Sequence, residues 1–294
     1  MSHRKMAPGT FTPSVLIIFC LLFFMFNHGN CIRETTEEHH HYHQQELFSG
    51  GENMNIQQVV GHSGDNHMDH IKASKIGFFT VDQLYVGKTM PISFPNIDFS
   101  SLPRFLQKRE ADIIPFTSSK LPQLLQFFSF PQESLQASQI ETTLKTCELK
   151  PIKGETKFCA TSFESLLDFV RDVLGKENHY KVLTTQHIKN PVAQNYTFLE
   201  ISQVFSSSNK IVACHILPYP YAVFYCHSPE ASKLFKIRVR GNENGDKVDG
   251  LAVCHMDTSD WISDDMFILL GVKRGNPICH FFSPATLIWV SYQP

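Results

Sequence analysis

Four adjacent cysteine–histidine pairs in the last third of this 294-residue chain restrict the folds that it can adopt. Gaps of 10, 26 and 23 residues separate the pairs, which contain four of the eight cysteines. Neighbouring side chains of a β-strand point to opposite faces. If the pairs lie on strands, each one sends a sulfur to one face and an imidazole to the other. The pairs are Cys214-His215, Cys226-His227, Cys254-His255 and Cys279-His280.

Three interpretations of these pairs stay open at the level of the sequence. In the first, the cysteines form two disulfides and the histidines bind a transition metal, with Cu(II) favoured by intrinsic affinity. In the second, cysteine and histidine together ligate zinc, although the short Cys-x-x-Cys spacing of structural zinc sites is missing. In the third, the imidazoles are core residues with hydrogen-bonded nitrogens. The candidate metal ligands are His215, His227, His255 and His280.

The N-terminus predicts secretion. Residues 1–30 combine Arg4 and Lys5 with an unbroken apolar run from Val15 to Phe26, which is typical of a signal peptide. A membrane span needs about 20 apolar residues, so this run is too short, and we expect no span after signal removal. Asn195-Tyr196-Thr197 is a glycosylation sequon in keeping with secretion.

The secretory compartment is oxidising and permits disulfides. Cys20 leaves with the signal and Cys31 lies at the new N-terminus, so six cysteines remain, for which 15 connectivities exist. Cys147 and Cys159 are 12 positions apart, and a local disulfide between them would be worth about 3 kcal/mol. The expected disulfide cysteines are Cys147, Cys159, Cys214, Cys226, Cys254 and Cys279.

Residues 31–77 are rich in His, Gln, Glu, Asn and Gly and poor in branched apolar residues. Such a segment buries too little apolar surface to offset the entropy of ordering, so we predict a disordered leader. Its histidine run at residues 39–43 has the composition of a tract with incidental metal affinity.

Charge and motifs exclude several function classes. The net charge is -2, from 26 basic and 28 acidic residues, and the chain has no basic tract, which argues against nucleic acid as a partner. The sequence also contains no Gly-x-Ser-x-Gly motif, phosphate loop or dinucleotide fingerprint.

The periodicity of residues 78–294 predicts one α+β domain. Residues 100–175 have helical spacing, most clearly from Phe163 to Leu174, and short β-branched or aromatic segments follow after residue 180. We therefore expect a helical N-terminal half of the domain, packed on a β-rich C-terminal half and stapled by disulfides. The expected strands are Lys210–Ile216, Ala222–His227, Leu234–Arg240, Leu251–His255, Phe267–Val272, Ile278–Phe282 and Leu287–Val290.

Around its Cys-His pairs the chain resembles the BURP-domain proteins, a plant-specific secreted family whose signature is four such pairs. The resemblance covers about residues 78–292, and the short, repeat-free leader is most similar to the unknown-seed-protein type. The segments that carry it include Phe78-Phe79, Gly87-Lys88, Met90-Pro91, Glu110-Ala111-Asp112, Gly154-Glu155, Cys159-Ala160-Thr161-Ser162, Pro218-Tyr219-Pro220-Tyr221 and Cys254-His255-Met256-Asp257.

The resemblance implies two functional classes. Some members are copper-dependent autocatalytic peptide cyclases, which cross-link a Trp or Tyr of a core peptide in their own leader, and for which the pair histidines are the expected copper ligands. Others are seed storage-vacuole, cell-wall or stress-associated proteins without a known reaction. Residues 31–77 contain no Trp and a single Tyr, Tyr42, which favours the second class.

We therefore predict a secreted plant BURP-domain protein of seed or reproductive development or of the stress response, with copper as its cofactor. Its expected location is the extracellular space, the cell wall or the protein storage vacuole, and its expected partners are wall polysaccharides or wall proteins. The alternative is a copper-dependent autocatalytic peptide cyclase, so the question of enzymatic activity stays open.

Overall fold

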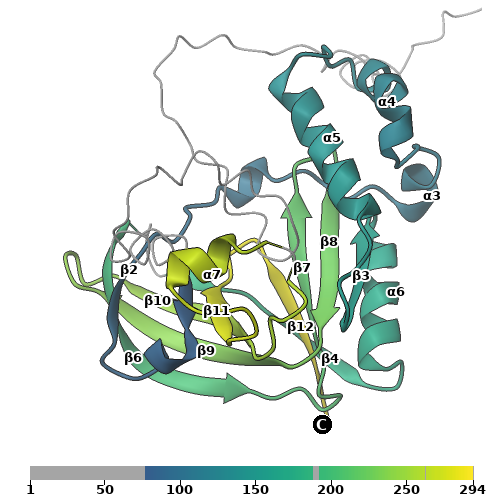
Figure 1. Cartoon of the computed structure of the whole chain (residues 1–294). Coiled ribbons are helices and arrows are strands. Elements are labelled where there is room, and N and C mark those ends of the chain that lie inside the picture. The colour runs from purple at the N-terminus through teal and green to yellow at the C-terminus, as the bar shows by residue number, and fades with distance from the viewer. Residues whose placement is uncertain (1–76, 188–191, 262, 294) are drawn as a thin grey trace, which may run out of the picture. The chain divides into compact units, whose positions relative to one another are not determined.

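Two antiparallel β-sheets dominate the described part of the chain (Figure 1). The computed structural model describes residues 77–187, 192–261 and 263–293. One sheet has seven strands in the order β1-β11-β10-β9-β6-β2, with β5 paired to β10. Its strands are β1 (Phe78–Thr80), β2 (Thr89–Ile92), β5 (Gln186–His187), β6 (Gln194–Val204), β9 (Ser232–Gly241), β10 (Lys247–His255) and β11 (Ile278–Phe281).

The second sheet has five strands in the order β3-β8-β7-β12-β4, again with antiparallel neighbours. Short helices lie between or beside the strands, and α6 runs alongside β3 (Figure 1). The strands of this sheet are β3 (Glu155–Ala160), β4 (His179–Leu183), β7 (Ile211–Leu217), β8 (Val223–Pro229) and β12 (Leu287–Tyr292). The described α-helices are α3 (Lys108–Ala111), α4 (Leu121–Phe127), α5 (Leu135–Glu148), α6 (Phe163–Leu174) and α7 (Asp265–Leu270).

The helix expected from Phe163 to Leu174 is confirmed as α6. The Ser162 hydroxyl accepts a hydrogen bond from the Ser165 amide at 3.1 Å and so caps the helix start. Gly175, whose φ is 97°, follows the last helical residue. The helix is strongly amphipathic, and its buried residues are Leu166, Val170 and Leu174.

The expected division into a helical first half and a β-rich second half is wrong. β1 and β2 precede the helices, and β3 lies between α5 and α6. Each of these early strands pairs with a strand from the second half: β1 with β11, β2 with β6, and β3 with β8. Pairing between segments far apart in the sequence leaves no trace in local periodicity. The domain is therefore mostly β, with short helices attached to two sheets.

Six of the seven strands expected after residue 180 are present as β7 to β12, with ends that differ by a few residues. The seventh, Phe267–Val272, is wrong, because this apolar run forms α7. Gly271 in the left-handed conformation (φ 61°) ends that helix. The sequence also failed to indicate β3, β4 and β6, which are only partly buried.

The two sheets face each other across an apolar layer. Ile211 and Ile288 of the five-stranded sheet pack there with Leu234 and Leu251 of the seven-stranded sheet. We call the faces that meet in this layer the inner faces. The outer face of the five-stranded sheet is covered by α6, and the outer face of the seven-stranded sheet carries an aromatic cluster around Phe281.

Several predictions lie outside the described residues. They are the signal peptide at 1–30, the leader at 31–77 apart from Gly77, and the positions of Cys20 and Cys31. Within the described ranges, none of the helices has both the length and the apolar character needed to cross a bilayer.

Candidate functional site

Each cysteine of the four Cys-His pairs is bonded to the cysteine directly opposite it on the neighbouring strand. Cys214 of β7 faces Cys226 of β8, and Cys254 of β10 faces Cys279 of β11. Both disulfides have a Cα–Cα distance of 3.9 Å, and all four side chains are fully buried. The sulfurs lie on the outer faces, in the cluster beneath α6 and in the aromatic cluster. They therefore join neighbouring strands within each sheet.

The histidines of the same pairs project from the inner faces, because adjacent residues of a strand alternate in direction. His227 lies opposite Ala213, and His280 lies opposite Val253. Ala213 and Val253 belong to the apolar layer between the sheets. Each sheet therefore directs two imidazoles into this layer and two sulfurs away from it.

The four imidazoles form two close couples. The Nε2 atoms of His215 and His227 are 3.3 Å apart, and so are the Nε2 atoms of His255 and His280. Each couple is a diagonal contact between neighbouring strands, and all four residues are buried. We call His215 with His227 the first couple, and His255 with His280 the second couple.

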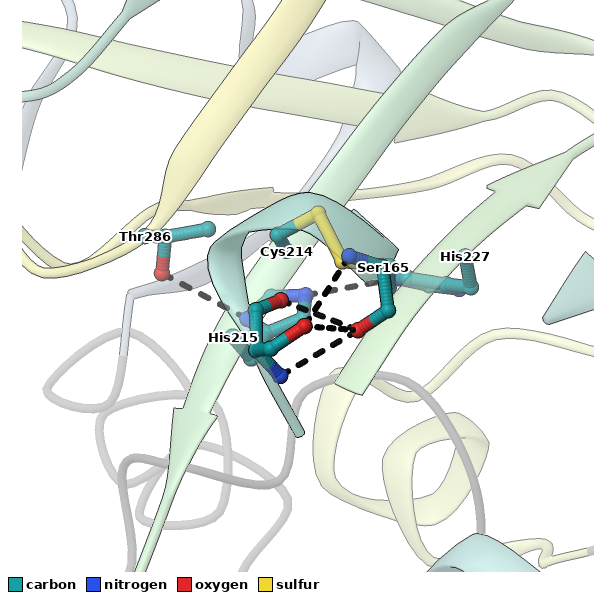
Figure 2. The surroundings of a disulfide bond; sticks show 7 residues. Ser165, Cys214, His215, His227 and Thr286 are labelled. Carbon is teal, nitrogen blue, oxygen red and sulfur yellow. Dashed lines mark hydrogen bonds between the residues drawn. A yellow bond between two sulfur atoms is a disulfide. The ribbon is translucent and has the colours of Figure 1, made fainter. Parts of the chain in front are cut away.

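The other ring nitrogens of the first couple contact polar groups. The Nδ1 atom of His227 lies 2.7 Å from Oε1 of Glu155, at the start of β3, and the Tyr225 hydroxyl donates to the same oxygen at 3.5 Å. The Nδ1 atom of His215 lies 3.4 Å from the Thr286 hydroxyl. Figure 2 shows His215 between Thr286 and His227, beside the disulfide of Cys214. Both imidazoles are thus held at both nitrogens.

The second couple has neutral partners at its Nδ1 atoms. The Nδ1 atom of His255 lies 3.3 Å from the Ser232 hydroxyl, and Nδ1 of His280 lies 3.2 Å from the carbonyl oxygen of Phe281. The first couple differs in this respect, because one of its Nδ1 partners is a carboxylate.

Aromatic rings form the apolar surroundings of both couples. The Phe282 ring lies 6.0 Å from the ring of His215 and 5.1 Å from the ring of His280, so it touches one member of each couple. The Trp261 ring packs at 5.4 Å against His255. The couples are therefore neighbours in buried surroundings that include aromatic rings.

Burial favours the neutral form of three of these imidazoles. It lowers the pKa of His215 and of His255 well below the ordinary value of 6.5, and the neighbouring imidazoles lower these pKa values further. Burial also lowers the pKa of His280 to about 4, although the contact with the Phe281 carbonyl opposes this change. Neutral imidazole is the form that binds metal ions.

Comparison with known proteins identifies the family. The family model named BURP domain matches residues 77–291. The chain belongs to the BURP-domain family. It is 39% identical over 223 residues to BURP domain-containing protein BNM2A of Brassica napus, which covers 73% of this chain and 79% of that protein. It is 40% identical over 223 residues to BURP domain protein USPL1 of Arabidopsis thaliana, with the same coverage.

A third relative, BURP domain protein RD22 of Arabidopsis thaliana, is 37% identical over 218 residues, which cover 73% of this chain and 55% of that protein. The predicted membership of the BURP-domain family is confirmed, and the similarity to USPL1, which is unknown seed protein-like, agrees with the predicted subgroup. These relatives are plant proteins.

The donor chemistry of the histidine couples in this BURP domain fits a transition-metal ion. Two nitrogens bound to one tetrahedral ion at about 2.0–2.1 Å stand roughly 3.3–3.4 Å apart, which matches the Nε2–Nε2 distance of 3.3 Å in each couple. No three His, Cys, Asp or Glu side chains of the described ranges are grouped closely enough to hold one ion. Each couple therefore offers two nitrogen ligands to a metal ion.

The sequence did not single out the residues that support the imidazoles. Glu155 lies about sixty positions before the first Cys-His pair, and only its place in a segment typical of the BURP domain pointed to it. Ser232, Phe282 and Thr286 carried no recognisable signal, because each reaches the site through strand pairing or a turn.

The remaining predicted site residues lie apart from the histidine couples. Cys147 at the end of α5 is disulfide-bonded to Cys159 on β3, with a Cα–Cα distance of 5.8 Å. Asn195 of the sequon is exposed on β6, opposite Pro91 of β2. The BURP domain thus has three disulfides among its described residues, two behind the histidine couples and one between α5 and β3.

Proposed function

We propose that this BURP-domain protein binds a transition-metal ion, copper above all, through the histidine couples between its sheets. One observation carries the proposal: two couples of buried imidazoles hold their Nε2 atoms 3.3 Å apart. The candidate ligands are those expected from the sequence, His215, His227, His255 and His280. Imidazole nitrogens suit Cu(II), whose intrinsic affinity for such donors is the highest among the divalent first-row metals.

The electrostatic surroundings of the couples support a cation. The side chain of Glu155 is buried and holds the Nδ1 atom of His227, which is the arrangement that commonly supports a metal-binding imidazole. Protonation of His215, His255 and His280 is disfavoured by burial and by the neighbouring imidazoles, which lower their pKa values. These three imidazoles therefore each keep one lone pair at neutral pH. An Nε2 atom that donates within a couple must pass its proton to Nδ1 before it can bind a metal ion.

We further propose that the protein is secreted and acts in seed or reproductive development or in the stress response, in the cell wall or the storage vacuole, with wall polysaccharides or wall proteins as partners. Three disulfides suit an oxidising compartment, and the similarity to USPL1 supports the connection with seeds. A fluorescent fusion of the full chain in developing seeds tests the location, and retention in the cytosol would refute it.

Titration of the purified full chain with Cu(II) tests the metal proposal. The protein is stripped with a chelator, and binding is followed by calorimetry and by the nitrogen hyperfine pattern in electron paramagnetic resonance. His215→Ala and His255→Ala should each weaken binding about tenfold or more. The control His179→Ala removes an exposed histidine of β4 and should bind like the wild type. A variant without the histidines of residues 39–43 and without His62, His67 and His70 removes binding by the leader histidines.

Two outcomes would refute the metal proposal. The first is a wild-type protein whose copper binding disappears when the leader histidines are replaced. The second is undiminished binding by both His215→Ala and His255→Ala, provided that circular dichroism shows folded variants. The same preparation examines the cyclase alternative, because oxidative cross-linking, with the added Cu(II) as the electron acceptor, removes two hydrogens from a peptide of residues 31–77. Mass spectrometry before and after copper loading detects that loss.

A further inference from the structure

Glu155 is a buried carboxylate beside the first histidine couple. The exposed fraction of its side chain is 6%, and that of its partner His227 is 4%. Its Oε1 atom contacts Nδ1 of His227 at 2.7 Å and accepts from the Tyr225 hydroxyl at 3.5 Å, while Oε2 accepts from the Ile152 amide at 3.4 Å. Pairing of β3 with β8 holds it in place, since Lys157 lies opposite His227.

These contacts determine which nitrogen of His227 carries the proton. A carboxylate only accepts hydrogen bonds, and a neutral imidazole has one N–H and one lone pair. Nδ1 of His227 therefore donates to Glu155, and the lone pair on Nε2 faces His215. Within this couple, Nε2 of His215 then donates to Nε2 of His227. The Nδ1 atom of His215 can accept from Thr286, because a hydroxyl is able to donate or accept.

The second couple repeats this pattern without a carboxylate. The Phe281 carbonyl also only accepts, so Nδ1 of His280 donates to it and Nε2 keeps a lone pair directed at His255. The Ser232 hydroxyl occupies the position that corresponds to Thr286. The two couples thus have the same donor pattern, but a negative charge lies next to the first one.

We propose that Glu155 is the positioning residue of this site. It holds His227 in the tautomer whose Nε2 lone pair faces the partner imidazole, and its charge makes the first couple the tighter of two metal-binding half-sites. The difference in affinity rests on the metal binding proposed above. The tautomer of His227 is a property of the metal-free protein and does not depend on that proposal. The two parts are therefore tested separately.

Histidine ¹⁵N chemical shifts in the metal-free full chain test the tautomer, because protonated and lone-pair nitrogens resonate at different positions. In the wild type we expect a protonated Nδ1 and an unprotonated Nε2 at His227. Glu155→Ala should move His227 toward a mixture of the two tautomers, and Ser232→Ala should leave His227 unchanged. A wild-type protein with the proton of His227 on Nε2 overturns the proposal even if Glu155→Ala does not fold.

Copper titration of Glu155→Gln tests the role of the charge, because the amide keeps the size of the side chain and an oxygen that accepts from Nδ1. We expect binding about 10–100-fold weaker than in the wild type. Ser232→Ala, which changes the second couple, should have a smaller effect. Equal affinities of wild type and Glu155→Gln overturn the proposed role of the charge. A wild type that binds no copper refutes the metal proposal instead, and the ¹⁵N measurement still decides the role of Glu155 in positioning.

Discussion

Acidification should destabilise the metal-free protein through its buried histidines. Burial lowers the pKa of His280 from 6.5 to about 4 in the folded chain, whereas the unfolded chain keeps the ordinary value. Between these values the unfolded state binds more protons than the folded state. The contribution of His280 to the free energy of unfolding is therefore fully present above about pH 6.5, and it is lost as the pH decreases toward 4. His215 and His255, whose pKa values are lowered by the same cause, act in the same direction.

The magnitude for His280 follows from the two pKa values. Each pKa unit corresponds to about 1.4 kcal/mol, so the change from 6.5 to about 4 costs roughly 3 kcal/mol once His280 is protonated in both states. About 2 kcal/mol of this is already lost at pH 5. Carboxylates with a lowered pKa, such as Glu148 and Asp249, stay ionised at that pH and add little.

Urea unfolding at about pH 7 and about pH 5, after treatment with a chelator, measures this loss. The wild type should lose about 2 kcal/mol or more. His280→Gln, which has no titrating group at this position, should lose less than the wild type over the same interval. His179→Gln, on the exposed side of β4, should lose as much as the wild type. Equal losses in the wild type and His280→Gln would refute the assignment of the effect to the buried imidazole.

Three further predictions concern residues outside the histidine couples. Replacing Cys147 and Cys159 together by Ser opens a disulfide with a sequence separation of 12 and should lower the free energy of unfolding by about 3 kcal/mol in urea; a change below about 1 kcal/mol would contradict this. Gly250→Ala places a Cβ 2.9 Å from two ring carbons of Phe281 and should cost about 1–3 kcal/mol, so an unchanged melting temperature would count against the packing described for this strand. Asn195, exposed on β6, should carry a glycan in the secreted protein; treatment with a glycosidase should increase gel mobility for the wild type and not for Asn195→Gln.

Local patterns in the sequence predicted those elements whose stability depends on near neighbours. The helix α6 was recognisable because its apolar stripe from Phe163 to Leu174 lies within one continuous segment of the chain. The strands β7 and β8 were recognisable as apolar segments bounded by turn residues. By contrast, α7 was taken for a strand, since a short apolar run fits either structure and the Gly271 helix stop was overlooked.

The strands that escaped prediction depend on partners far away in the chain. Along β6 the partly exposed side chains and an irregularity between Phe198 and Glu200 interrupt the two-residue alternation. β3 has exposed positions as well, and its place at the edge of the five-stranded sheet comes from its pairing with β8. The wrong division into a helical and a β-rich half followed from these omissions.

The sequence by itself determined that sulfur and imidazole leave each Cys-His pair in opposite directions, because alternation along a strand is a local property. It also determined the family, since the spacing of the pairs and the segments around them are visible without a structure. Only the tertiary structure decided which cysteine bonds to which, since direct register partners come from strand pairing. It also decided that the imidazoles meet between two sheets and that Glu155 stands behind His227, because residues from separate strands become neighbours only when the sheets are assembled.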